Sequence, residues 1–207
     1  MQEWLSMTAA DLGRGIGDGQ IDPVTLCQTY LDAIDAHPLR DRIYARVTAD
    51  RALTEAGAAR DRARAGQRLS LLDGVPISWK DLFDTAGVAT EAGSALLKDR
   101  VPDRDARVLA NATAMGLVCL GKTHMSELAF SGLGYNPSTA TPPCVNDEDA
   151  VSGGSSSGAA AKTDQPHCRR IRQHTRVARI RYRRIGARAC SLERSGGAEN
   201  HIGPCVA

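Results

Sequence analysis

The sequence predicts an α/β fold, in which a mixed β-sheet is flanked by helices. Segments with helical spacing, short apolar strand-like segments and loops follow one another over the first three quarters of the chain. Hydrophobic residues make up 42% of the 207 positions, which is enough for a packed core, and charged residues make up 24%. The order of the segments favours mixed or mostly parallel strands.

Helices are predicted in the first third of the chain. Residues 7–37 predict two helices, the first capped by Thr8 and the second, over residues 23–37, opening on Pro23 in its first turn. Residues 47–67 are rich in alanine, with charges at helical spacing. This pattern is typical of a helix with one face in solvent and the other on the core.

Two strands follow, separated by a helix. Residues 75–81 are short and partly apolar, and predict a strand that ends near Lys80. Residues 105–116 predict an amphipathic helix, and residues 117–123 predict a buried strand. Residues 131–152 are rich in Gly, Pro, Ser, Thr and Asn, so we expect a long irregular connection, of a kind that is usually functional or disordered.

The charge distribution divides the chain after residue 161. Residues 1–161 contain 15 Lys and Arg against 21 Asp and Glu, a net charge of −6, whereas residues 162–207 contain 11 against 3, a net charge of +8. Ten of those 11 basic residues are arginine. We therefore expect residues 1–161 to form the folded part and residues 162–207 to be a separate arginine-rich tail.

Composition also argues against several classes of protein. No apolar run has the length of a membrane span, and the N-terminus lacks the apolar region of a secretory signal, so a cytoplasmic location is expected. The six cysteines have irregular spacings with no Cys-x-x-Cys pair, which predicts free thiols and no metal site. They are Cys27, Cys119, Cys144, Cys168, Cys190 and Cys205.

The segment Gly-Gly-Ser-Ser-Ser-Gly-Ala-Ala-Ala, residues 153–161, is the first candidate for chemistry. Its glycines allow a sharp turn, and the alanines that follow favour a helix whose first turn offers unpaired N–H groups. Serines placed there can be held close to a negative reaction centre. A flexible Gly/Ser linker has the same composition, and this interpretation stays open from the segment alone.

Lys80 is the second candidate. A lysine at the end of an apolar strand is either exposed, paired with an acid, or functional. A desolvated lysine has a lowered pKa, so it can be neutral and accept a proton. Lysine together with serine is a known alternative to the histidine-based catalytic triad.

Three motifs in order resemble the amidase signature family of hydrolases. Residues 74–81 match its Gly-Val-Pro-Ile-x-x-Lys-Asp strand, and residues 121–128 match its Gly-Lys-Thr-Asn-Met segment, with His124 in place of the usual Asn. Residues 153–161 match its Gly-Gly-Ser-Ser segment. The resemblance covers roughly residues 7–161.

The resemblance implies a Ser-Ser-Lys triad that cleaves a carboxamide C–N bond of a small-molecule substrate without cofactor or metal. By motif position, Lys80 is the base and Ser155 is the relay serine, whose preceding peptide bond is cis in the family. In that relay, neutral Lys80 takes the proton of Ser155, which takes the proton of a nucleophilic serine. The substrate-binding residues stay unknown at this point.

The family's nucleophile motif, Asp-Thr-Gly-Gly-Ser, has no match in this sequence. Its expected position falls near Arg179, inside an arginine-rich stretch. When the codons of residues 175–184 are read two bases out of phase, they permit Gly-Gly-Ser and a later Pro-Ala, but not every residue of the motif. We hypothesise that the tail is a frameshifted reading of an amidase gene from near Lys162, and expect the chain to be truncated and nearly inactive.

Two other interpretations of function remain at this stage. The amidase signature family includes the amidase subunit of the tRNA-dependent amidotransferase, which needs partner subunits, although residues 130–137 favour a free-standing amidase. The tail is alternatively a genuine basic arm that binds RNA phosphates, with Tyr182 available for stacking; we consider nucleic-acid binding the weaker interpretation.

Overall fold

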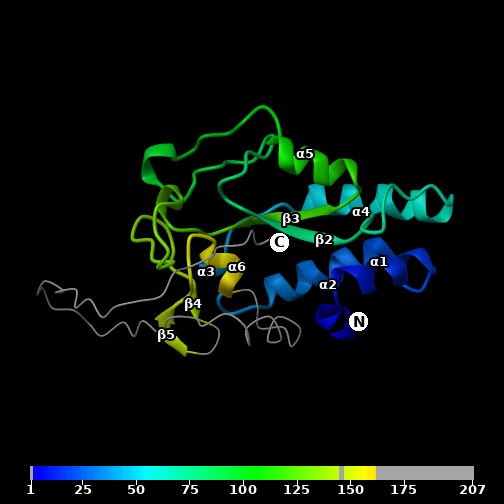
Figure 1. Ribbon diagram of the computed structural model, residues 1–207, viewed down its shortest axis with the longest axis horizontal. Helices are drawn as coiled ribbons and strands as arrows, with labels where there is room; N and C mark the ends of the chain where they lie inside the picture. The colour runs from blue at the N-terminus through cyan, green and yellow to red at the C-terminus, as the bar shows by residue number, and fades with distance from the viewer. Residues whose placement is uncertain (1, 145–146, 162–207) are drawn as a thin grey trace, which may run out of the picture.

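The computed structural model describes residues 2–144 and 147–161 (Figure 1). The predicted tail, residues 162–207, and the hypothesis of a frameshift near Lys162 lie outside the described residues. The α-helices are α1 (Ala9–Gly17), α2 (Pro23–Asp35), α3 (Arg40–Ile43), α4 (Ala49–Arg64), α5 (Arg107–Ala114) and α6 (Ser157–Ala161). The strands are β1 (Tyr44–Val47), β2 (Pro76–Lys80), β3 (Val118–Thr123), β4 (Pro143–Cys144) and β5 (Asp147–Val151), and the short 3-10 helices are η1 (Gln2–Ser6), η2 (Ala95–Leu97) and η3 (Glu127–Ala129).

The main sheet has three strands in the order β1-β3-β2. β1 runs antiparallel to β3, with Tyr44 opposite Thr123. β2 runs parallel to β3, with Pro76 opposite Val118 and Lys80 opposite Thr123. The sheet is therefore mixed, and the predicted α/β class is confirmed. Because β2 and β3 are parallel, both end at the same edge of the sheet.

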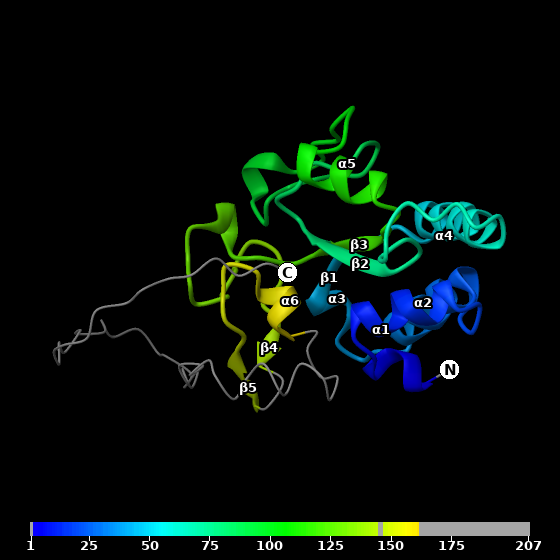
Figure 2. The same ribbon diagram turned by 45° about the vertical axis from the view of Figure 1, so that its right-hand side comes forward.

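Helices lie on both sides of this sheet. In Figures 1 and 2, β2 and β3 pass between α1 and α2 on one side and α5 on the other. The two predicted N-terminal helices are present. Thr8 caps the first as predicted, with its Oγ1 accepting from Asp11 N at 3.0 Å, and the Asp22 carboxylate caps the second by accepting from Thr25 N at 2.9 Å. Such caps each stabilise a helix by about 1 kcal/mol.

Two apolar clusters hold the helices against the sheet. The larger one joins α2, α4, β1 and β3, and the smaller one joins α1, α2 and the residue before β2. Full burial of a leucine side chain stabilises the fold by about 1.5–3 kcal/mol. The buried members of the larger cluster are Cys27, Leu31, Ile34, Ile43, Tyr44, Ala52, Ala56, Val118, Leu120 and Ala161, and those of the smaller are Leu12, Ile16, Ile21, Leu26 and Val75.

The structure contains strands in two places where the sequence predicts none, and the short helix α3 is also not predicted. Residues 44–47 form β1, for which the sequence predicts no strand. The predicted irregular connection, residues 131–152, contains the antiparallel pair β4 and β5, so the prediction is wrong for this part. In both cases the strand is defined by its partner in space, and a run of two to five residues carries little periodicity of its own.

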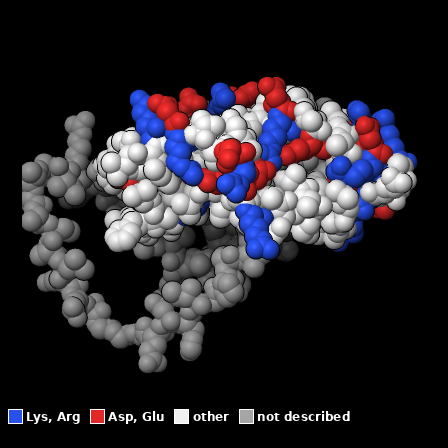
Figure 3. Space-filling model, turned by 90° about the horizontal axis from the view of Figure 1, so that it is seen from above, with Lys and Arg blue, Asp and Glu red and all other residues white. Residues whose placement is uncertain are grey.

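The face that carries α5 has a mixture of charges (Figure 3). Acidic and basic side chains are interspersed on it. Among the ion pairs of the described part, Arg100 lies 2.6 Å from Asp84, and both side chains are partly exposed. An exposed pair of this kind contributes at most about 1 kcal/mol. The visible face of the described part therefore lacks the continuous basic surface typical of nucleic-acid binding.

The turn between α5 and β3 depends on Gly116, and this dependence gives a first prediction. Gly116 has a φ of +88°, and a Cβ there would lie 2.1 Å from Oδ1 of the buried Asp73. We expect Gly116→Ala to lower the free energy of unfolding by about 2–3 kcal/mol, because the positive φ strains an alanine backbone and the added methyl group would collide with Asp73. Gly57→Ala in α4 is the matched control, because a Cβ added at Gly57 would have no atom within 4 Å. It should raise the free energy of unfolding by about 1 kcal/mol.

Urea denaturation followed by circular dichroism measures both changes. Equal stabilities for the two variants would contradict the assigned geometry of the turn.

Candidate active site

The structure brings the two predicted catalytic residues into contact. Lys80 is the last residue of β2, and Ser155 lies two residues before α6. The Nζ atom of Lys80 lies 2.6 Å from the Oγ atom of Ser155, although 75 positions separate the two in the sequence. This is a short hydrogen bond, at a distance that permits direct proton transfer.

Backbone hydrogen bonds hold Ser155 in place. Its carbonyl oxygen accepts from Ser126 N at 3.0 Å, and Gly154 N donates to the carbonyl oxygen of Gly132 at 2.8 Å. The peptide bond between Gly154 and Ser155 is cis, as the resemblance implies. The segment that carries Ser155 is therefore attached to the loop that follows β3, beside the end of β2.

The surroundings of Lys80 favour its neutral form. Burial lowers the pKa of the Lys80 ammonium below its usual value, because desolvation penalises the charged form. Among the residues that the structure describes, no carboxylate forms an ion pair with Lys80, so nothing there opposes this effect. In its neutral form, Lys80 can accept the hydroxyl proton of Ser155.

Asp81, the next residue, is fixed through its backbone. Its N–H donates to the carbonyl oxygen of Thr123 at 3.0 Å, and its carbonyl oxygen accepts from Ala92 N at 3.0 Å. The first bond extends the pairing of β2 with β3 by one residue, and the second attaches the loop that follows β2. The chain on the C-terminal side of Lys80 is thereby held on both sides.

The Asp81 carboxylate belongs to a buried charge cluster with Lys122. Lys122 is fully buried, its Nζ lies 3.3 Å from Asp81 Oδ1, and it donates to Thr90 Oγ1 at 2.8 Å. Arg46 lies 3.4 Å from the same carboxylate oxygen and also pairs with Glu91. Burial lowers the pKa of Lys122, and Asp81 opposes this effect. A buried charge remains stable only where such partners surround it.

His124, which departs from the family motif, joins β3 to α6 through its main-chain atoms. Its N–H donates to the carbonyl oxygen of Ile43 at 2.9 Å, and its carbonyl oxygen accepts from Gly158 N at 2.8 Å. The imidazole is partly buried, and desolvation lowers its pKa. The link from the end of β3 to α6 therefore uses the peptide groups of residue 124.

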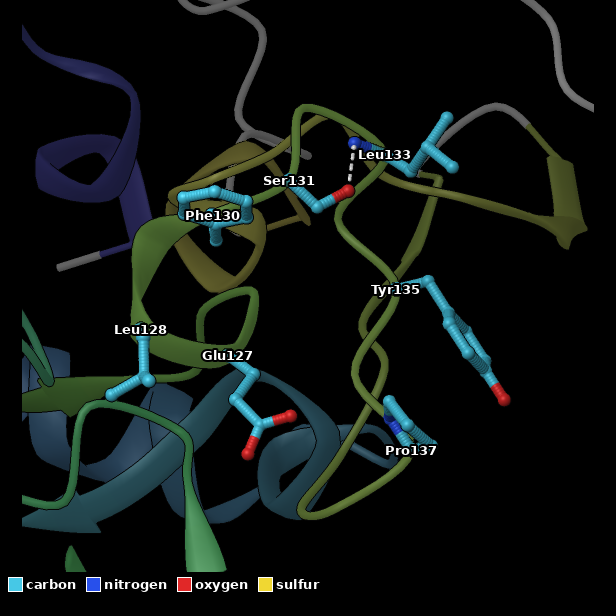
Figure 4. Close-up of a pocket in the computed structure, with 7 residues that line it drawn as sticks. All are labelled: Glu127, Leu128, Phe130, Ser131, Leu133, Tyr135 and Pro137. Carbon is cyan, nitrogen blue, oxygen red and sulfur yellow. Dashed lines mark hydrogen bonds between the residues drawn. The ribbon is translucent and has the colours of Figure 1, made fainter. Parts of the chain in front are cut away.

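An apolar hollow lies on the loop that carries Ser126 and Gly132. Its volume is about 400 Å³, and Figure 4 shows the side chains arranged around it. Phe130 is 95% exposed, and Leu133 N donates to Ser131 Oγ at 3.1 Å, which shapes the turn between them. The lining residues are Glu127, Leu128, Phe130, Ser131, Leu133, Tyr135 and Pro137.

Other kinds of site are not found in residues 2–144 and 147–161. Within these ranges, no three His, Cys, Asp or Glu side chains come together as a metal-binding group. No helix in the same ranges is long and apolar enough to span a membrane. Cys27 and Cys119 are buried free thiols, and burial raises the pKa of Cys27 to about 12.

Comparison with known proteins identifies the family. The protein-family model for Amidase matches residues 25–163 of this chain, which includes β2, β3 and the segment with Ser155. The chain belongs to the amidase signature family. The resemblance drawn from the three motifs is thereby confirmed.

Several curated relatives are amidotransferase subunits. A glutamyl-tRNA(Gln) amidotransferase subunit of Marinobacter nauticus is 37% identical over 158 residues, which cover 74% of this chain and 32% of that protein. The corresponding subunit of Thermobifida fusca is 39% identical over 163 residues, which cover 78% of this chain and 32% of that protein. The chain thus spans about a third of the length of the curated amidase relatives it matches.

Solved structures of amidases share the fold. Native peptide amidase from Stenotrophomonas maltophilia matches with a TM-score of 0.68 and 34% identity, over 75% of this chain and 33% of that one. A structure described as revealing the origins of an s-triazine catabolic enzyme matches with a TM-score of 0.71 and 31% identity, over 75% of this chain and 34% of that one.

The sequence predicts part of this candidate site. Lys80 and Ser155, the two candidates from the motifs, are in contact, whereas the sequence analysis predicts no role for the side chains of Asp81 and Lys122. The signal for this pair was a lysine inside the apolar strand 118–123, but its partner depends on the register between β2 and β3. The position expected for the nucleophile, near Arg179, lies outside the described residues.

The buried cluster beside Lys80 gives a second prediction. Asp81→Asn leaves Lys122 without its carboxylate in a buried position, so we expect a loss of about 3–5 kcal/mol in the free energy of unfolding. Asp84→Asn is the matched control: its partner Arg100 is 44% exposed, and we expect a loss of at most about 1 kcal/mol.

Urea denaturation of both variants makes the comparison. Adding Lys122→Met to Asp81→Asn should recover part of the loss, since no buried charge is then left without a partner. Similar losses for Asp81→Asn and Asp84→Asn would refute the pairing.

Proposed function

We propose that Lys80 and Ser155 are the base and the relay of a centre that hydrolyses carboxamide C–N bonds. Neutral Lys80 accepts the hydroxyl proton of Ser155, and Ser155 accepts the proton of a nucleophilic serine that attacks the amide carbonyl. The same path in reverse delivers the proton to the leaving amine or ammonia. Water then hydrolyses the acyl-enzyme.

The contact between Lys80 Nζ and Ser155 Oγ is the observation that carries this proposal. At 2.6 Å it joins two side chains that the family motifs assign to one relay, and burial of Lys80 favours the neutral amine that a base requires. Membership of the amidase signature family supports the reaction class. The centre needs neither metal nor cofactor in this proposal.

The third group of the triad is proposed to come from outside residues 1–161. That part of the sequence contains no Asp-Thr-Gly-Gly-Ser motif. We therefore propose that the 207-residue chain alone hydrolyses amides very slowly or not at all, because a site without its nucleophile keeps only weak residual catalysis.

The apolar hollow is the proposed contact for a hydrophobic part of the substrate. It lies on the loop whose Ser126 N and Gly132 carbonyl oxygen hold the Ser155 segment. Exposed aromatic and aliphatic side chains, among them Phe130 and Leu133, suit an alkyl or aryl group better than a charged one.

The alternative is the amidase subunit of a tRNA-dependent amidotransferase. Amidotransferase relatives at 37% and 39% identity favour it, whereas the match to peptide amidase favours a free-standing enzyme. The amidotransferase function would require partner subunits. The interpretation of residues 162–207 as an RNA-binding arm lies outside the described residues.

A chimaera tests the proposed roles of Lys80 and Ser155. In it, residues 25–161 of this chain replace the matching third of Stenotrophomonas maltophilia peptide amidase, which supplies the remaining two thirds. We expect peptide-amide hydrolysis, and a loss of at least about 1,000-fold in kcat with Lys80→Ala or Ser155→Ala. Lys98→Ala and Ser138→Ala, both at exposed positions, are the controls and should keep the activity.

Retention of activity in Lys80→Ala or Ser155→Ala would refute the proposed relay. If amide hydrolysis instead requires added amidotransferase subunits, that result would favour the amidotransferase-subunit function.

The proposed inactivity of the chain by itself is tested directly. Purified 207-residue protein and its Lys80→Ala variant are incubated with a series of primary amides, and released ammonia is measured. We expect the two proteins to give the same background rate, because no nucleophile is available to the relay. Turnover by the unaltered chain that is lost in Lys80→Ala would disprove the inactivity and would support Lys80 as a base.

A further inference from the structure

We propose that Ser155 is itself a nucleophile, and that the Lys80–Ser155 pair accepts an acyl group from an activated ester onto Ser155 Oγ. This activity goes beyond the proposed amide hydrolysis, in which Ser155 only relays a proton. The two proposals share the transfer of the Ser155 hydroxyl proton to Lys80, and differ in whether Ser155 then attacks the substrate itself.

The geometry is that of a serine–lysine dyad. Lys80 Nζ lies 2.6 Å from Ser155 Oγ, and within the described ranges no other group makes a hydrogen bond to that hydroxyl. Ser155 and Lys80 are both partly exposed, so a small ester can approach the oxygen. The backbone of Ser155 is fixed by Ser126 N at 3.0 Å, which limits the entropy lost on reaction.

The electrostatic setting distinguishes Lys80 from the other lysine of the sheet. Lys122 is fully buried and pairs with Asp81 at 3.3 Å, which favours its charged form. Lys80 has no carboxylate partner within the described part of the chain, and burial lowers its pKa. A neutral amine next to a hydroxyl is the arrangement that activates a serine.

The step balances with the two residues and the ester alone. Ser155 Oγ forms a bond to the ester carbonyl carbon, and its proton moves to Lys80 Nζ. The tetrahedral intermediate breaks its bond to the aryl oxygen, which leaves with the electron pair as a phenolate. The products are an acylated Ser155 and a free phenolate, and the Lys80 ammonium then returns its proton to water.

An activated ester is the substrate class that this pair suits. A nitrophenolate is a weak base, so it leaves without protonation. An amide must have its leaving nitrogen protonated, and its less reactive carbonyl depends more strongly on an oxyanion site. Acylation of Ser155 by an ester is therefore compatible with the absence of amide turnover proposed above.

The neighbouring nucleophiles provide controls. Ser156 is exposed and directly follows Ser155, whereas Ser157 is buried. No hydrogen bond joins either of them to Lys80 in the described part. Simple exposure would therefore favour reaction at Ser156, and activation by Lys80 favours reaction at Ser155.

The test uses the purified 207-residue chain and p-nitrophenyl acetate. Release of p-nitrophenolate gives the rate, and tandem mass spectrometry of peptides locates the acetyl group. We expect acetylation at Ser155 and loss of that adduct in Ser155→Ala. In Lys80→Met, the rate of Ser155 acetylation should fall at least about 100-fold. Ser156→Ala and Lys98→Met should keep the adduct at Ser155.

The pH dependence provides a second readout that needs no variant. A protonated Lys80 cannot accept the hydroxyl proton, so the rate of Ser155 acetylation should rise with pH and level off once Lys80 is neutral. Because burial lowers the pKa of Lys80, the plateau should begin below the ordinary lysine value of about 10.4.

Near-UV circular dichroism of the Lys80→Met variant checks that this variant is folded.

Three results would overturn the inference: no acetyl group on Ser155, an equal rate at Ser155 in folded Lys80→Met, or a rate that rises with hydroxide without a plateau. Failure of the inference about Ser155 acylation can be told apart from failure of the proposed amide hydrolysis. Acetylation of Ser155 together with an amide-inactive chimaera would refute the relay alone, and an active chimaera without acetylation would refute the inference alone.

Discussion

The parallel pairing of β2 with β3 is the constraint on which the candidate site depends. It sets Lys80 level with Thr123, so the loops that follow both strands begin at one edge of the sheet. The segment with Ser155 attaches to the loop after β3 and directs its hydroxyl to the last residue of β2. A shift of one residue in this register would turn Lys80 to the opposite face and separate the pair.

The two lysines near this edge, Lys80 and Lys122, differ in burial and in their ion pairing. Lys122 is enclosed completely and neutralised by Asp81, so it contributes to the fold through a satisfied charge. Lys80 is partly exposed and forms no ion pair with a carboxylate in the described part of the chain, so its neutral form is favoured. Asp81 is covalently next to Lys80 and paired with Lys122, so the buried cluster helps to fix the position of Lys80.

The sequence predicted what depends on local pattern and on ordered motifs. The strand ending at Lys80 and the cap at Thr8 follow from neighbouring residues, and Ser155 was assigned by motif position. β1 was missed because four residues show no clear period and Tyr44 is defined by its pairing with Thr123. The Asp81–Lys122 pair was missed because 41 positions separate its members and only the folded register shows that they meet.

The connection between β3 and α6 is made by main-chain atoms. Residue 124 donates to Ile43 and accepts from Gly158 through its peptide group, and these two bonds do not involve its side chain. Both bonds are present although an imidazole stands where an amide is usual in the family. The main-chain link between β3 and α6 is therefore kept at a position where the side chain departs from the family motif.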